Sequence, residues 1–261
     1  MVILAFAGLY VVFYFAQTGL IFRGDPVMGK TPDELGWDFE EVALPVTGET
    51  TYGWFIPVED ARGAVLFSHG NDGNMSTRLE MVRRLRGYGL SVLLYDYGGF
   101  GRSTGRPSEK RVYADARAMW DYLTEAQGVP PHRIVLYGRS FGGGATCELA
   151  RRVQPAGVVL DSVFTSMADA AFSDYPWFPA SVFLRHRFDN KAKMAEITAP
   201  VLLIHSQGDT LYPYAHGREL LALAGEPKYF LEVYGDHGEG AAVSPRLYDQ
   251  GWDDFLTRVL P

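Results

Sequence analysis

Residues 138–142 read Gly-Arg-Ser-Phe-Gly and place a serine between two glycines. The preceding run Ile134 to Tyr137 is typical of a buried strand, and residues 143–153 are compatible with a helix. A serine on so sharp a turn has a strained backbone, and a side chain two residues to either side would collide with the neighbouring strand or helix. A lone match to this pattern is weak evidence. It nevertheless predicts a presented, nucleophilic hydroxyl at Ser140.

A serine nucleophile needs a base within hydrogen-bonding reach, and the base needs a carboxylate that holds its tautomer. We expect His237 to be this base, because it follows the strand-like run 228–234 and lies in a loop before the last helix. Catalytic groups of open α/β sheets lie in such loops. We interpret His69 as the end of a strand and His205 as a structural residue within a strand. The remaining three histidines are interpreted as surface residues: His132, His186 and His216.

Two aspartates follow strand-like runs and compete for the role of the acid. Asp209 follows the run 201–205 and precedes a turn into a helix, whereas Asp161 closes the run 157–160. The chain order Ser140, Asp209, His237 matches the order of the α/β hydrolases. We favour Asp209 over Asp161 because the downstream strand end is the usual position of the acid in that architecture.

A third element could stabilise the negative charge that develops during acyl transfer. The buried-type strand 64–68 ends in the small-residue loop 69–74, His-Gly-Asn-Asp-Gly-Asn. We expect the backbone amides of Asn71 and Phe141 to donate to the oxyanion, the second from the start of a helix whose dipole favours negative charge. An ordinary glycine-rich turn between strand and helix is the alternative.

These segments together resemble the serine α/β hydrolases with an HGN oxyanion loop, a group that includes single-pass membrane proteins called α/β-hydrolase-domain proteins. The resemblance covers nearly the whole chain and rests on residues 69–71, 95–103, 138–142, 161–164, 205–209 and 235–237. It implies Ser140 as nucleophile, Asp209 as acid, His237 as base, and Asn71 with Phe141 as oxyanion donors. One departure is Gly98, where relatives more often carry an arginine with a structural role.

The order of apolar runs predicts the α/β-hydrolase fold in residues 24–261, with about eight mostly parallel strands and helices on both faces of the sheet. The expected strands are 39–46, 51–57, 64–68, 91–96, 133–138, 157–161, 200–206 and 228–234. The expected helices are 76–87, 109–127, 140–153, 214–224 and 244–259.

An insertion at about residues 165–199, after the sixth of these strands, leaves the carboxyl end of the sheet and must pass over the nucleophile. It is rich in aromatic residues, so we expect a short cap that forms an apolar acyl pocket. The residues expected to line this pocket are Phe164, Trp177, Phe178 and Phe183. Alternatively, the aromatic residues only hold the cap in place.

The N-terminal segment 1–23 differs in character, because Val2 to Ala16 is an uninterrupted apolar or aromatic run. Only Gln17, Thr18 and Gly19 interrupt the apolar character before Arg23, so the whole segment is just long enough to cross a bilayer. It lacks the basic start and the cleavage site of a signal peptide. We therefore expect a single membrane-anchoring helix, with a helix lying on a surface as the alternative. Arg23 and Lys30 follow the segment and favour a cytoplasmic catalytic domain.

Composition narrows the remaining choices. The chain has 261 residues, a net charge of -7 and one cysteine, Cys147, so it has no intramolecular disulfide and no nucleic-acid partner is expected. No zinc-binding spacing occurs, and we expect no metal and no cofactor. The oligomeric state is left open.

The sequence thus predicts a serine hydrolase acting on carboxylic esters or thioesters of short-to-medium acyl or lipid-like substrates. The alternatives are a serine peptidase acting on short peptides and a noncatalytic membrane scaffold that retains the fold.

Overall fold

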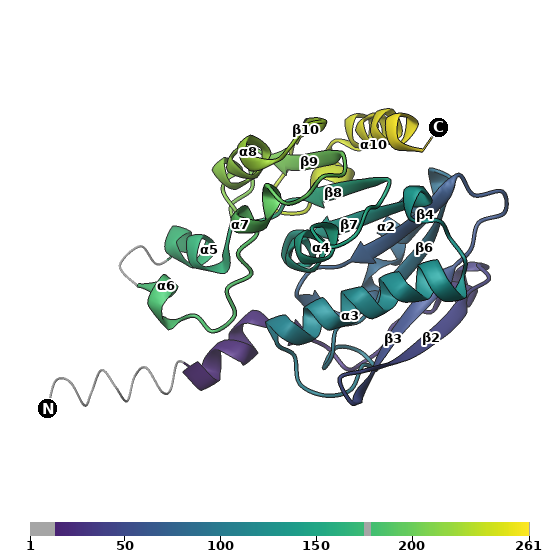
Figure 1. Cartoon of the computed structure of the whole chain (residues 1–261), viewed down its shortest axis with the longest axis horizontal. Coiled ribbons are helices and arrows are strands. Elements are labelled where there is room, and N and C mark those ends of the chain that lie inside the picture. The colour runs from purple at the N-terminus through teal and green to yellow at the C-terminus, as the bar shows by residue number, and fades with distance from the viewer. Residues whose placement is uncertain (1–13, 175–178, 261) are drawn as a thin grey trace, which may run out of the picture.

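The computed structural model describes residues 14–174 and 179–260 (Figure 1). An eight-stranded sheet crosses the molecule in the order β10-β9-β8-β7-β4-β6-β3-β2. Its strands are β2 (Glu40–Val46), β3 (Glu49–Ile56), β4 (Gly63–Ser68), β6 (Leu90–Tyr95), β7 (Ile134–Arg139), β8 (Gly157–Asp161), β9 (Val201–Ser206) and β10 (Lys228–Val233). Within this sheet only β3 runs antiparallel to its neighbours, so the predicted mostly parallel sheet is confirmed.

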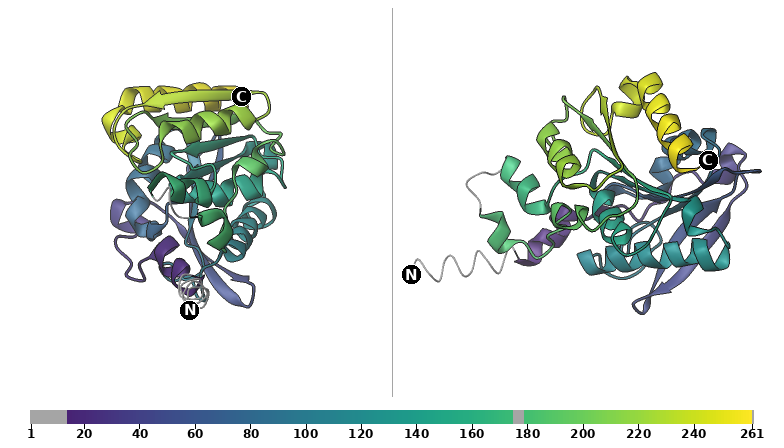
Figure 2. Two further views of the ribbon diagram at one scale, coloured as in Figure 1. Left: turned by 90° about the vertical axis from the view of Figure 1, so that its left-hand side faces the viewer. Right: turned by 45° about the horizontal axis from the view of Figure 1, so that its top comes forward.

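Helices cover both faces of the sheet, because successive strand residues point to opposite sides. In β4, Leu66 belongs to the apolar cluster under α3 (Glu109–Asp121), α4 (Gly143–Ala150) and α8 (Tyr214–Leu223). Its neighbours Val65 and Phe67 belong to the cluster under α2 (Leu79–Gly87) and α10 (Pro245–Val259). Figure 2 shows α3 (teal) and α10 (yellow) on opposite sides of the sheet.

The helices begin and end close to the predicted bounds, with local differences at their ends. Ser108 caps α3 by accepting a hydrogen bond from Arg111 N (3.2 Å), and α3 continues into a π-helical turn at Tyr122–Ala126. A 3₁₀ turn at Ser140–Gly142 precedes α4. The remaining short elements are the 3₁₀ turns Pro32–Leu35, Met75–Arg78 and Pro131–Arg133 and the helix α9 (Gly240–Val243).

The N-terminal segment is described from residue 14 onward and packs on the catalytic domain. Residues 14–21 form a short helix that leads into β1 (Arg23–Gly24), which pairs in parallel with β5 (Asp72–Gly73). Within the described residues, no helix has the length and apolar character needed to span a bilayer. The expected anchor falls mostly on residues 1–13, which lie outside the described part, so the anchor and its orientation stay predictions.

The segment 165–199 contains α5 (Met167–Asp174), α6 (Ala180–Phe183) and α7 (Lys191–Met194). It is tied to the body of the protein by the Glu109 carboxylate, which accepts hydrogen bonds from the backbone N–H groups of Arg187 (2.7 Å) and Phe188 (2.9 Å). It is also tied to the N-terminal helix, since Gln17 Oε1 accepts from Arg185 N (2.7 Å). The predicted pocket residues Trp177 and Phe178 lie outside the described residues.

Two histidines that the sequence placed at the surface are buried, which corrects that prediction. His186 is 3% exposed and His216 is 7% exposed. The ring of His186 packs edge-on against Phe22 (5.1 Å between centroids), and His216 Nδ1 lies 2.7 Å from Thr165 Oγ1. Both residues join the segment 165–199 to other parts of the chain, a long-range role that gives no local sequence signal.

The structure also shows what occupies the space left by the glycine at position 98. An added Cβ at Gly98 would lie 2.8 Å from Cγ and 2.9 Å from Cζ of Arg111. The buried Arg111 guanidinium pairs with Asp115 (2.7 Å), whose other oxygen accepts from Gly98 N (2.8 Å). The side chain of Arg111, from α3, therefore fills the space beside Gly98.

Candidate active site

Ser140 lies at the turn between β7 and α4 in a left-handed conformation, with φ of +53°. This conformation is unfavourable for a residue with a side chain and persists only where the surroundings enforce it. An added Cβ at Gly142 would lie 1.9 Å from Ser68 O, and one at Gly138 would lie 2.6 Å from Thr146 Oγ1. Both glycines are therefore required by close packing, as the sequence predicted.

Three side chains from three separate loops meet at this turn. His237 Nε2 lies 2.8 Å from Ser140 Oγ, and His237 Nδ1 lies 2.8 Å from Asp209 Oδ2. Asp209 follows β9 and His237 follows β10, and β9 and β10 are adjacent parallel strands whose carboxyl ends meet at one edge of the sheet. The structure thus brings together the three residues that the sequence proposed as nucleophile, base and acid.

The two candidate acids have different partners. Asp209 Oδ1 accepts hydrogen bonds from the backbone N–H groups of Leu211 (3.0 Å) and Tyr212 (2.8 Å), which leaves Oδ2 facing His237. The rival, Asp161, is occupied elsewhere, because its Oδ2 accepts from the hydroxyls of Tyr137 (3.0 Å) and Tyr248 (2.8 Å). The geometry therefore favours Asp209 as the partner of the histidine.

A layer of buried side chains supports the histidine loop. The ring of Tyr212 packs edge-on against His237, with 4.9 Å between centroids, and Phe164 packs on Tyr212 at 5.1 Å. His205 is fully buried in β9, and its Nε2 lies 2.8 Å from Tyr212 O, in keeping with a structural position within a strand. Phe164 reaches the site through Tyr212 and not as a residue lining the cavity beside Ser140.

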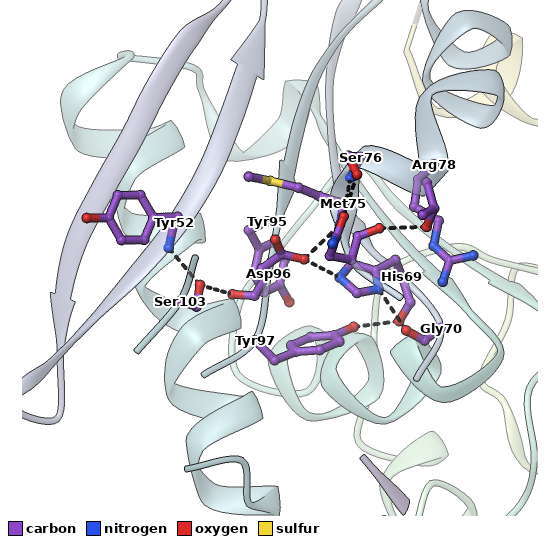
Figure 3. A network of polar contacts seen from close by, with 12 residues as sticks. Tyr52, His69, Gly70, Met75, Ser76, Arg78, Tyr95, Asp96, Tyr97 and Ser103 are labelled. Atoms are coloured by element: carbon purple, nitrogen blue, oxygen red, sulfur yellow. Dashed lines mark hydrogen bonds and ion pairs between the residues drawn. The ribbon is translucent and has the colours of Figure 1, made fainter. Parts of the chain in front are cut away.

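The loop proposed to bind the oxyanion is held by the buried network of Figure 3. His69 Nδ1 lies 2.7 Å from Gly70 O, and His69 Nε2 lies 3.2 Å from Asp96 Oδ1. The Tyr97 hydroxyl donates to His69 O (2.7 Å), and Met75 N donates to Asp96 Oδ1 (2.7 Å). Four of these five residues are buried and Gly70 is half-buried, so the backbone entering the loop is held in place by contacts that solvent does not reach.

The N-terminal segment holds the same loop from its other side. Arg23 N donates to Asn71 O (2.9 Å), and the Asn71 side chain donates from Nδ2 to Ile21 O (2.8 Å). Asn71 is therefore fixed by its carbonyl and its side chain. Its backbone amide and that of Phe141, at the start of the helix that follows Ser140, remain the predicted oxyanion donors.

A cavity of about 340 Å³ opens beside Ser140 and His237. Its wall includes Asn71 and three arginines that the sequence reasoning did not assign to the site, Arg23, Arg78 and Arg139. Arg139 is half-buried, and its guanidinium donates to Gly238 O in the histidine loop. Burial alone would lower the pKa of Arg139, but the Tyr137 hydroxyl and the Asp161 carboxylate nearby raise it overall, so its charge is retained.

The sequence carried one signal for these arginines. Arg139 stands inside the nucleophile motif, but Arg23 and Arg78 come from segments with no local mark of function. Phe164 and the half-buried Phe183 are not among the residues lining this cavity, so an apolar acyl pocket in the cap stays a prediction. Across the described ranges, no three His, Cys, Asp or Glu side chains are grouped as ligands of a metal ion.

The fold and the site define an α/β hydrolase with a serine, histidine and aspartate at the carboxyl edge of its sheet. A family model described as "Serine aminopeptidase, S33" matches residues 59–189. The chain is 38% identical to "Uncharacterized protein Rv2307c" of Mycobacterium tuberculosis over 210 residues, 79% of this chain and 75% of that protein. The chain therefore belongs to this family of α/β hydrolases and is an enzyme of the hydrolase class.

Two further comparisons agree with this assignment. "Alpha/beta hydrolase domain-containing protein 17B" of Xenopus tropicalis is 36% identical over 180 residues, which cover 67% of this chain and 60% of that protein. The structure of the esterase Pf2001 of Pyrococcus furiosus superposes with a TM-score of 0.78 at 19% identity, covering 92% of this chain and all of that one. The resemblance to the α/β-hydrolase-domain proteins is thereby confirmed.

Proposed function

We propose that the protein is a serine hydrolase that cleaves carboxylic esters or thioesters of short-to-medium acyl or lipid-like substrates through an acyl-enzyme intermediate. The observation that carries this proposal is the hydrogen-bonded chain from Ser140 Oγ to His237 Nε2 and from His237 Nδ1 to Asp209, with 2.8 Å at each step. This chain has the geometry that general-base activation of a serine requires.

In the acylation half-reaction, Ser140 Oγ attacks the carbonyl carbon of the ester and its proton passes to His237 Nε2. The oxyanion of the tetrahedral intermediate accepts hydrogen bonds from the amides of Asn71 and Phe141. Asp209 holds the ring so that Nδ1 carries a proton and stabilises the imidazolium. Collapse breaks the bond to the leaving alcohol or thiol, which takes the proton from His237.

In the second half-reaction a water molecule attacks the acyl-enzyme while its proton passes to His237. Collapse then returns this proton to Ser140 Oγ and releases the carboxylic acid. Loss of one donor of an oxyanion pair typically costs about 3 kcal/mol of transition-state stabilisation. Both half-reactions therefore depend on the fixed position of Asn71.

The description of the family model raises a peptidase acting on short peptides as the second candidate. An aminopeptidase must bind a protonated amine close to the scissile bond, which calls for carboxylates in the cavity. Three arginines and one aspartate, Asp72, line the cavity beside Ser140. This balance of charge disfavours a cationic amine, and the name of the Pyrococcus structure, an esterase, agrees with the ester proposal.

Labelling with a fluorophosphonate tests the proposal, because the reagent reacts with an activated serine. We expect labelling of the wild-type chain and none of Ser140→Ala, together with hydrolysis of 4-nitrophenyl butanoate. An unlabelled wild-type protein would favour the noncatalytic scaffold. Cleavage of an aminoacyl 4-nitroanilide at a higher kcat/KM than the butanoate ester would favour the peptidase.

A further inference from the structure

The cavity beside Ser140 is positively charged in a chain that carries a net charge of -7. Arg23, Arg78 and Arg139 line it together with one carboxylate, Asp72. The cavity thus has a local excess of two positive charges, whereas the chain as a whole has more acidic than basic residues. Lysine is absent from the lining, and arginine is the side chain that binds carboxylate and phosphate groups with paired N–H donors.

Much of the hydrogen-bonding capacity of these arginines is unused by the described residues. Arg23 is exposed, and no described side chain forms an ion pair with its guanidinium. Arg78 donates from Nη2 to the carboxylate (2.8 Å) and to the carbonyl oxygen of Asp72, and its buried Nε has no hydrogen-bond partner in the described part of the chain. Arg139 uses one donor on Gly238 O. A guanidinium has five N–H donors, so several remain for a ligand.

The backbone brings these arginines to the nucleophile. Arg23 is placed by the pairing of β1 with β5, in which it faces Asp72 one residue beyond Asn71. Arg78 ends the 3₁₀ turn that follows this loop, and Arg139 immediately precedes Ser140. Three segments far apart in the sequence thus supply one charge each to the wall of one cavity.

The side of the scissile bond that this charge faces follows from the role of His237. The histidine that takes the proton of Ser140 must return it to the leaving group, so the leaving oxygen or sulfur lies against His237 Nε2. His237 and Gly238 line the same cavity as the arginines. A leaving group held against His237 Nε2 can therefore reach the positively charged space.

We propose that the preferred substrates are acyl esters or thioesters whose alcohol or thiol part carries a carboxylate or phosphate group that binds to Arg23, Arg78 and Arg139. This inference rests on the proposed function of the same site and adds the chemical class of the leaving group. The anion could belong to a soluble carboxylate ester or to a phosphate-bearing lipid, and two substrate pairs distinguish these sources.

The test compares pairs of esters, one with and one without an anionic group on the leaving alcohol; the carboxylate and carboxamide pair is also isosteric. 4-Carboxyphenyl butanoate is paired with 4-carbamoylphenyl butanoate, and 1-octanoylglycerol 3-phosphate with 1-octanoylglycerol. We expect the anionic member to have the higher kcat/KM by roughly tenfold at low ionic strength, with the ratio falling in 0.5 M salt because salt screens partly exposed charges. A preference confined to the second pair would assign the phosphate-bearing lipid as the source.

Variants connect the ratio to the cavity. We expect Arg23→Gln to lower the anionic-to-neutral ratio about fivefold and Asp72→Asn to raise it. Arg258→Gln is the matched control, because Arg258 stacks on Tyr229 (5.2 Å) near the opposite end of β10 and should leave the ratio unchanged. A wild-type ratio near one, or a ratio unaffected by Arg23→Gln, would overturn the inference.

Two further measurements complete the test. Binding of the two butanoate esters to the Ser140→Ala variant measures the charge preference without catalysis. This measurement tests the inference even if the wild-type protein does not hydrolyse esters and the proposed function is wrong. We expect tighter binding of the carboxylate, and equal binding would contradict the proposal. A further substrate pair carries the anion on the acyl side: 4-nitrophenyl hydrogen adipate and the corresponding amide. An anionic-to-neutral ratio of kcat/KM that is larger for this pair than for the leaving-group pairs would refute the assignment to the leaving group.

Discussion

The substitution Asp209→Asn tests the assignment of the catalytic acid, and the hydrogen bonds of the carboxylate determine its effect. Asp209 Oδ1 accepts from the N–H groups of Leu211 and Tyr212, at 3.0 and 2.8 Å. A carboxamide has one acceptor oxygen, and that oxygen must occupy this position to avoid two unsatisfied donors. The amide nitrogen of the substituted side chain then faces His237 Nδ1.

A donor facing Nδ1 selects the wrong tautomer of the histidine. Nδ1 must then accept, so the proton of the neutral ring moves to Nε2, which lies 2.8 Å from Ser140 Oγ. A protonated Nε2 cannot take the proton of the serine. The loss in kcat expected for this change is about 10³- to 10⁴-fold, or about 4 to 5.5 kcal/mol of transition-state stabilisation.

The assay is the hydrolysis of 4-nitrophenyl butanoate, with Asp161→Asn as the matched control. Asp161 accepts from Tyr137 and Tyr248, so its substitution should cost about 1 to 3 kcal/mol of folding free energy while kcat falls less than tenfold. Urea denaturation of both variants separates unfolding from catalytic loss. The reasoning is refuted by a larger loss of kcat in Asp161→Asn than in Asp209→Asn when both variants are folded.

Two other substitutions test the packing around the site. Gly142→Ala should prevent folding or destabilise the protein strongly, because its Cβ would lie 1.9 Å from Ser68 O; a thermal unfolding midpoint within 2 °C of wild type, roughly the effect of 0.5 kcal/mol, would contradict this. Burial and the adjacent Arg185 lower the pKa of His186 to about 4, below the value of about 6.5 in the unfolded chain. The unfolded state therefore binds the proton first as the pH falls from 6.5 to 4, and up to about 3 kcal/mol of stability is lost over that window. His186→Gln should show a smaller loss between pH 7 and pH 4.5 in urea denaturation, and an equal loss would assign the acid sensitivity to other groups.

The fold could be predicted because its signals are local and repeat along the chain. Apolar runs of strand length alternate with helical segments, and β8 was predicted with its observed bounds, 157–161. The turn at Ser140 was predictable for the same reason, since the two glycines are needed by strand and helix packing within a few residues. Asp209 and His237 were predictable because parallel strands carry the groups that follow them to one edge of the sheet.

Other features depend on contacts between distant segments, which leave no periodic mark. The pairing of β1 with β5 places Arg23 beside Asn71, although the sequence suggested only that Arg23 flanks an apolar segment. The same kind of contact buries His186 against Phe22 and fills the space above Gly98 with Arg111. Each of these required coordinates, because residue type alone does not specify a partner many positions away.

The amino-acid sequence by itself determined the class of fold, the sharp turn that presents Ser140, and the residues able to serve as its base and acid. Only the tertiary structure decided which aspartate faces His237 and which charges surround the reacting bond. The physical reason is that backbone preferences and apolar periodicity act over a few residues. The electrostatic character of a cavity, by contrast, is the sum of side chains that meet only when the chain has folded.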